Sequence, residues 1–294
     1  MIRIIEVGPR DGLQNEKIPV PLEVKLRFIA ALFEAGLPEI EATSFVSPKW
    51  VPQLGDSLEL VPLLPAGPMY SALVPNVRGL ESALTVGMDR IAVFTAASSA
   101  FTEKNINMTV EQSLEAFADV LTKFRDQKPT GFVRGYVSTA FDCPFAGRVP
   151  TSDVVDVVEK LLALGVDEIS IGDTIGTAVP ADVKQLSQAL GGIEKSKLVW
   201  HFHDTRGAAI SCVAQALDLG FNAFDSSAAG LGGCPYAPGA GGNLATDDLV
   251  YFCERSGLST GVNPEKLAKA SLEVLEVLQK RPFAKAQQAL LSSL

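Results

Sequence analysis

The chain has 294 residues, of which 47% are hydrophobic and 20% charged, and its formal net charge is −9. This composition excludes a disordered chain, and the acidic balance argues against a nucleic-acid partner. Apolar runs all stay below the about 20 residues that a membrane span needs. The first residues predict a strand and show no secretory signal, so we expect a cytoplasmic protein with no membrane partner.

In chain order, short β-branched runs alternate with amphipathic helical stretches eight times. The predicted strands are 2–7, 39–43, 69–74, 90–95, 132–138, 168–171, 198–203 and 223–226. The predicted helices are 22–35, one from about 56, 79–86, 110–128, 153–164, 181–189, 208–219 and 244–255. Four glycines each follow a helix and fit the position after its last residue: Gly36, Gly87, Gly165 and Gly220.

Eight strand–helix units predict one (β/α)₈ TIM barrel, which is a closed ring of parallel strands surrounded by helices. We place the barrel over about 1–256 and a C-terminal helical extension over about 257–294, with a helix at 264–280, in a single domain. An open doubly wound sheet is the alternative, but no GxGxxG motif follows the first strand.

Unusual polar residues cluster where the predicted strands end, which is where TIM barrels carry their chemistry. They are Arg10 and Asp11 after strand one, Glu41 on strand two, Asp173 after strand six, His201 and His203 on strand seven, and Asn243 after strand eight. A non-enzymatic binding protein would have no reason to gather them at one end of the barrel.

The only two histidines, His201 and His203, stand two residues apart on one strand, so both face the barrel interior. Neutral imidazole is a common ligand of divalent ions. Asp11 supplies a charged third ligand, and Asn243 can supply an oxygen. This mixed set suits Mg²⁺ or Mn²⁺ better than a closed structural zinc site.

Structural alternatives stay open for several of these residues. The two histidines can be structural, and Arg10 with Asp11 can be a buried ion pair. Glu41 can be a structural partner of Arg10 while also serving catalysis. Asp173 can act in helix capping, next to a turn at Gly176.

The segment Gly230–Gly242 holds six glycines, two prolines and Cys234. We interpret it as a mobile lid that carries a reactive thiol, the alternative being a flexible surface connection. The other cysteines, Cys143, Cys212 and Cys253, lie in structural contexts. With no CxxC pair, the sequence indicates neither a disulfide framework nor a structural zinc site.

The chain resembles the hydroxymethylglutaryl-CoA lyase family over nearly its whole length. The matching segments are 10–17, 41–50, 104–107, 172–176, 201–205, 230–240 and 242–246. The Arg-Asp-Gly sequence also occurs in related barrel enzymes that run Claisen-type condensations, whereas the cysteine segment Gly230–Ala240 is specific to the lyase branch.

The resemblance implies a role for each matching residue. Asp11, His201, His203 and Asn243 look like metal ligands, Arg10 like the group that holds the thioester carbonyl, and Glu41 like its orienter. Asp173 is similar to an aspartate near the substrate, and Cys234 to the catalytic thiol. Position 206 departs from the family because it is arginine where many members have tyrosine.

We therefore expect a metal-assisted retro-Claisen cleavage of 3-hydroxy-3-methylglutaryl-CoA to acetoacetate and acetyl-CoA, as in leucine degradation and ketone-body formation. The base is left open among Asp173, His201 and a bound water. Lysines in the loops are candidates for binding the CoA phosphates, unless they are merely solvated. These CoA-binding candidates are Lys17, Lys49 and Lys104, with Asn105 beside the last.

The alternatives are a lyase for a related branched 3-hydroxyglutaryl-CoA, a Claisen-type acyl-CoA synthase and a metal-dependent hydrolase. A synthase of the isopropylmalate type normally carries a regulatory domain for which the chain has no room. We also expect a homodimer or a higher homo-oligomer.

Overall fold

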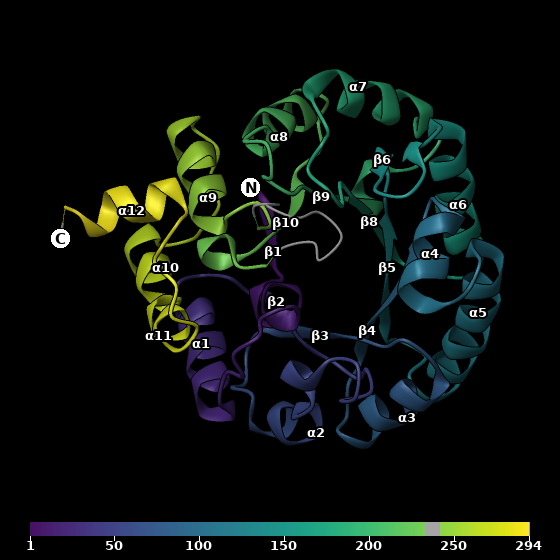
Figure 1. The fold of residues 1–294 in the computed structure, drawn as a ribbon, viewed down its shortest axis with the longest axis horizontal. Coiled ribbons are helices and arrows are strands. Elements are labelled where there is room, and N and C mark those ends of the chain that lie inside the picture. Colours follow the sequence, from purple (N-terminus) through teal and green to yellow (C-terminus); the bar gives the residue numbers. More distant parts are fainter. Residues whose placement is uncertain (233–241, 294) are drawn as a thin grey trace.

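The computed structural model describes residues 1–232 and 242–293. Eight parallel strands close into a barrel in the order β1-β10-β9-β8-β5-β4-β3-β2, and helices surround it (Figure 1). The TIM-barrel prediction is thus confirmed. The barrel strands are β1 (Arg3–Glu6), β2 (Glu39–Ser44), β3 (Met69–Leu73), β4 (Arg90–Ala96), β5 (Phe132–Ser138), β8 (Glu168–Gly172), β9 (Leu198–His201) and β10 (Ala223–Ser226).

Each strand sends alternate side chains to opposite faces, as a pleated backbone requires. The outward face packs under the helices, which bury it with their own apolar stripes. The helices of this layer are α1 (Leu22–Glu34), α2 (Ser57–Leu60), α3 (Val77–Thr85), α5 (Val110–Gln127), α6 (Thr151–Ala163), α7 (Pro180–Ala189), α8 (Ala209–Asp218) and α9 (Thr246–Arg255).

The inward face is unusually polar at the end of the barrel where the strands begin. Arg3 bridges Glu39 and Glu168, and Arg134 bonds to Glu168 at 2.7 Å and to Asp225 at 2.7 Å. Apolar side chains fill the rest of this interior, among them Ile5, Val7, Val199 and Ala223. The pairs Arg3–Glu39 and Arg134–Glu168 join neighbouring strands, whereas Arg3–Glu168 and Arg134–Asp225 cross the barrel interior. Each of these charges therefore has a partner of opposite sign.

Several elements were not predicted. The stretch after β4 forms a helix, α4 (Ser99–Ile106), and a short hairpin, β6 (Asp142–Cys143) with β7 (Gly147–Arg148), follows β5. Beyond the barrel, the helix predicted at 264–280 is present as two consecutive helices, α10 (Pro264–Ala270) and α11 (Leu272–Val277), and an unpredicted helix, α12 (Lys285–Leu291), follows. Figure 1 shows these last helices outside the ring, beside α1 and α9.

The four glycines expected after helices all adopt positive φ, between 82° and 102°, which confirms the predicted helix ends. In the described part of the chain, no helix is both long enough and apolar enough to cross a membrane.

Candidate metal centre and active site

Strand β9 places the two histidines at the mouth of the barrel. His201 is its last residue and His203 follows two positions later, with ring centroids 5.1 Å apart. The residues between and before them face outward, where Trp200 and Phe202 stack with ring centroids 5.6 Å apart in the layer under the helices. The alternation of the strand therefore sends both imidazoles inward, as predicted.

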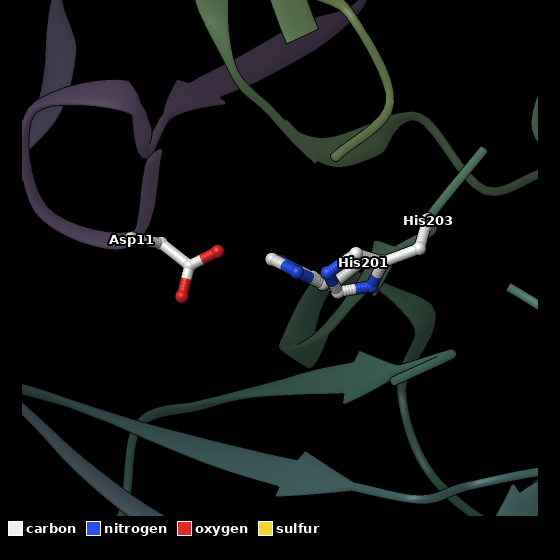
Figure 2. A group of neighbouring side chains, drawn as sticks. All are labelled: Asp11, His201 and His203. Atoms are coloured by element: carbon white, nitrogen blue, oxygen red, sulfur yellow. The ribbon is translucent and has the colours of Figure 1, made fainter. Parts of the chain in front are cut away.

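Asp11 reaches the same point from the π-helical turn Gly8–Gly12 that follows β1. One ligand atom from each of Asp11, His201 and His203 can be chosen so that all three lie within 4.8 Å of one another. Figure 2 shows the carboxylate of Asp11 facing the two imidazoles. Asn243 joins them, because its side-chain nitrogen donates to Asp11 Oδ2 at 2.8 Å and its backbone pairs with His203.

Both imidazoles have their Nδ1 atoms engaged by the protein. His201 Nδ1 lies 3.1 Å from Asp225 Oδ2, and His203 Nδ1 lies 2.8 Å from the backbone oxygen of Asp173. Because both partners are acceptors, each Nδ1 carries the proton, and the Nε2 lone pair is free for another contact.

The donor set fits a divalent cation. The side-chain nitrogen of Asn243 is directed at two acceptors, Asp11 and the Leu231 backbone oxygen, which fixes the amide orientation. Its Oδ1 is buried and has no hydrogen-bond partner among the described residues. A buried orphan acceptor is costly, and a cation shared with Asp11 and two Nε2 atoms would satisfy it.

Burial and the neighbouring imidazole lower the pKa of His203 to about 4, so it is neutral in the physiological range as a metal ligand must be. Burial acts on His201 in the same direction, but the hydrogen bond and charge of Asp225 outweigh it and raise the pKa of His201. Asp225 itself is held ionised, because Arg134 and His201 offset its burial and keep its pKa below the usual range.

Arg10 lies beside the metal ligands with 6% of its surface exposed. Its guanidinium donates to Glu41 Oε2 at 2.7 Å and to Asp11 Oδ1 at 2.7 Å. The ion pair with Glu41 that the sequence suggested is therefore present, and it holds the guanidinium next to Asp11. Glu41 is fully buried and its Oε1 has no partner among the described residues.

Sequence reasoning missed Tyr136 and Asp225. The Tyr136 hydroxyl donates to Glu41 at 2.9 Å, and its ring lies 5.2 Å below the Arg10 guanidinium carbon. The signal was present in the strands: Arg134, Tyr136 and Asp225 are polar residues at inward positions of predicted buried strands.

Asp173 is 3% exposed, and its carboxylate accepts hydrogen bonds from the backbone of Thr177 and Ala178. These bonds stabilise the turn before α7, whose N-cap is Val179, whereas the sequence suggested helix capping by Asp173 as the alternative to a catalytic role. Burial raises the pKa of Asp173 to about 6. Its backbone oxygen also accepts the hydrogen bond from His203 Nδ1, so Asp173 positions one of the candidate metal ligands.

The predicted CoA-binding residues are exposed and follow strand ends at the same face of the barrel. Lys17 follows the β1 turn, Lys49 follows β2, and Lys104 and Asn105 lie on α4. Arg206 donates to the backbone oxygens of Ile175 and Gly176, so it ties the segment after β9 to the turn after β8. Cys234 lies outside the described residues.

The fold and these side chains define a class: a (β/α)₈ barrel with a candidate divalent-cation centre at the carboxyl ends of its strands. The HMGL-like family model matches residues 1–274. The chain belongs to the HMGL-like family.

Two kinds of similar protein support this assignment. The bovine (Bos taurus) mitochondrial hydroxymethylglutaryl-CoA lyase is 47% identical over 291 residues, which is 98% of this chain and 89% of that protein. A hydroxymethylglutaryl-CoA lyase structure from Pseudomonas aeruginosa superposes with a TM-score of 0.96 at 43% identity, covering 100% of this chain and 98% of the other. The structure of an Acinetobacter baumannii HMG-CoA lyase in complex with coenzyme A and 3-methylmalate superposes with a TM-score of 0.92 at 35% identity. The match covers 98% of this chain and 95% of the other.

Proposed function

We propose that this protein cleaves 3-hydroxy-3-methylglutaryl-CoA to acetoacetate and acetyl-CoA, with Mg²⁺ or Mn²⁺ held by Asp11, His201, His203 and Asn243. The observation that carries the proposal is the convergence of these four residues beside the buried Arg10 in a chain of the HMGL-like family. The similar proteins named as lyases favour this reaction over the branched-substrate and synthase alternatives.

The reaction breaks one carbon–carbon bond. The tertiary hydroxyl loses its proton and becomes the ketone of acetoacetate, and the bonding electron pair moves onto the carbon that becomes the acetyl methyl. The resulting thioester enolate takes up one proton to give acetyl-CoA. The bound cation would lower the pKa of the tertiary hydroxyl.

Arg10 is suited to the enolate oxygen because its guanidinium is permanently charged and is held by two carboxylates rather than by solvent. Fixed donors that need no reorganisation are the most effective way to stabilise developing charge. Glu41 and Tyr136 set the position of Arg10 from below, which supports the orienting role assigned to Glu41.

Two proton transfers complete the reaction. His201 is poorly placed to act as the base once it serves as a ligand, because both of its ring nitrogens are then engaged. Asp173 is the remaining side-chain candidate, since burial brings its pKa to about 6, close to the working range of a base. For the carbon we propose the Cys234 thiol as proton donor, on the sequence resemblance alone.

The thioester carrier would be bound at the exposed face by Lys17, Lys49, Lys104 and Asn105. The Acinetobacter baumannii structure, whose description names coenzyme A, supports a CoA ligand for a chain of this fold. A cytoplasmic location, a place in leucine degradation and a homodimer or higher homo-oligomer stay predictions, which cell fractionation, a gene-deletion phenotype and sedimentation would test.

The decisive assay is product analysis. Purified protein with Mg²⁺ and the thioester should release acetoacetate and acetyl-CoA in equal amounts, with no free CoA. Release of free CoA would instead assign a hydrolase, and absence of both products would remove the proposed reaction.

A further inference from the structure

A second carboxylate stands directly behind one of the two histidines. Asp225 lies on β10, in register with His201 on the neighbouring parallel strand β9, so both side chains point to the barrel interior. Asp225 is 1% exposed. Its Oδ2 lies 3.1 Å from His201 Nδ1.

Every contact of this carboxylate has a defined direction. Arg134 donates to Oδ1 at 2.7 Å, and the Ser170 hydroxyl donates to Oδ2 at 2.6 Å. An ionised carboxylate only accepts hydrogen bonds, so His201 Nδ1 must be the third donor. The proton is then on Nδ1, and Nε2 is the nitrogen left to face Asp11.

The second histidine is supported differently. His203 Nδ1 donates to the backbone oxygen of Asp173 at 2.8 Å, which is a neutral acceptor. A carboxylate behind an imidazole raises the basicity of the ring more than a carbonyl does. The two rings are therefore chemically unequal although they come from one strand.

We propose that Asp225 is a positioning residue for His201: it fixes the ring as the Nδ1–H tautomer, turns Nε2 toward Asp11, and makes His201 the stronger imidazole donor of the pair. The ion pair with Arg134 holds Asp225 in place for this role. The assignment rests on the cation site of the proposed function, but its test measures the tautomers of the two imidazole rings directly.

No other histidine signal can interfere with that test, because His201 and His203 are the only histidines in the chain. Labelling with ¹⁵N-histidine gives two ring systems, and a His203→Gln variant assigns them. In cation-free wild-type protein at pH about 8.5, the long-range ¹H–¹⁵N correlations should show both rings as Nδ1–H tautomers. A His201 ring protonated at Nε2 would overturn the proposal without any variant at position 225.

The variant Asp225→Asn separates positioning from mere structure. Arg134 can bond only to the amide oxygen, so the amide NH₂ group is left to face His201 Nδ1. A donor there forces the proton to Nε2, and the ring can no longer offer a lone pair to the cation. We expect the His201 tautomer to switch while the His203 signals stay unchanged, and Mn²⁺ affinity to fall about 10- to 100-fold.

Ser170→Ala is the matched control, since it removes one hydrogen bond to the same oxygen but keeps the carboxylate. It should retain the tautomer and lose little Mn²⁺ affinity, as measured by electron paramagnetic resonance of free Mn²⁺. The proposal is overturned if Asp225→Asn keeps the Nδ1–H tautomer, or if it binds Mn²⁺ within about twofold of wild type. Wild-type protein that binds Mn²⁺ but does not cleave the thioester would refute the proposed reaction and leave Asp225 in its role.

Discussion

Replacing Arg10 by glutamine tests whether its charge acts in the transition state. The structure shows two separate consequences of removing the guanidinium: the loss of a fixed donor beside Asp11, and a fully buried Glu41 left without its cation. Losing one such donor typically costs a factor of about 10²–10³ in kcat, or about 2.7–4 kcal/mol. Breaking a buried pair on one side costs about 3–5 kcal/mol of stability unless the remaining acid protonates.

A second variant separates these two effects. Arg10→Gln/Glu41→Gln removes the orphaned carboxylate as well, so its free energy of unfolding should recover toward wild type while kcat stays low. Arg3→Gln is the control, because it breaks partly buried ion pairs with Glu39 and Glu168 at the opposite end of the barrel and should lower stability with little change in kcat.

The assay follows acetyl-CoA release under steady-state conditions, with thermal unfolding of each variant measured in parallel. Two results would refute the reasoning. A change confined to KM would assign Arg10 to ground-state binding. Recovery of kcat in the double variant would show that the single variant fails because Glu41 is left unpaired.

Three further predictions concern the cation, the thiol and a buried acid. Removal of divalent cations with a chelator should abolish turnover, and added Mg²⁺ or Mn²⁺ should restore it. Full turnover by protein shown to be cation-free would contradict the proposed cation dependence of the reaction. Cys234→Ser should fold normally and keep its Mn²⁺ affinity but lose most turnover, and a near-wild-type rate would make the thiol a bystander. Burial raises the pKa of Glu6 from 4.5 to about 7, so its contribution to stability is present below about pH 4.5 and lost as pH rises through 7. Wild-type unfolding free energy should therefore fall relative to Glu6→Gln across that window in denaturant titrations, and parallel curves would count against an ionisable Glu6.

Chemical labelling supplies an independent measurement on Cys234. The remaining cysteines are buried, and burial raises the pKa of Cys212 to about 12 and of Cys253 to about 11, so almost none of either is thiolate near pH 8. One equivalent of iodoacetamide should therefore modify Cys234 first, and a bound substrate analogue should protect it. First labelling at Cys143, Cys212 or Cys253 would contradict this assignment.

The barrel could be predicted because its strands are short, apolar and regularly spaced. The strands 132–138 and 223–226 agree with the structure to the residue, and the other strand ends differ by at most two positions. The signal fails where periodicity is absent: α4 begins in a run of small and polar residues, and the β6–β7 hairpin has only two residues in each strand.

The cluster of Asp11, His201 and His203 could also be predicted, because a closed barrel brings the carboxyl ends of all its strands to one rim. What could not be predicted were the contacts inside the barrel. These depend on strand register, which sequence patterns do not fix for buried parallel strands. Asp225 meets His201 only because the β9–β10 register pairs those two positions.

The barrel interior explains why an ionised aspartate can stand behind His201 at all. A single buried carboxylate would be driven to its neutral form. Here the charges alternate along connected partners: Arg3 bonds to Glu168, Glu168 to Arg134, and Arg134 to Asp225. Because Arg134 compensates Asp225 from below, the carboxylate stays an acceptor and the imidazole above it must present Nε2 to the mouth of the barrel. The Arg134–Asp225 pair, which links the polar interior to the mouth of the barrel, thus sets the geometry of His201 as a ligand.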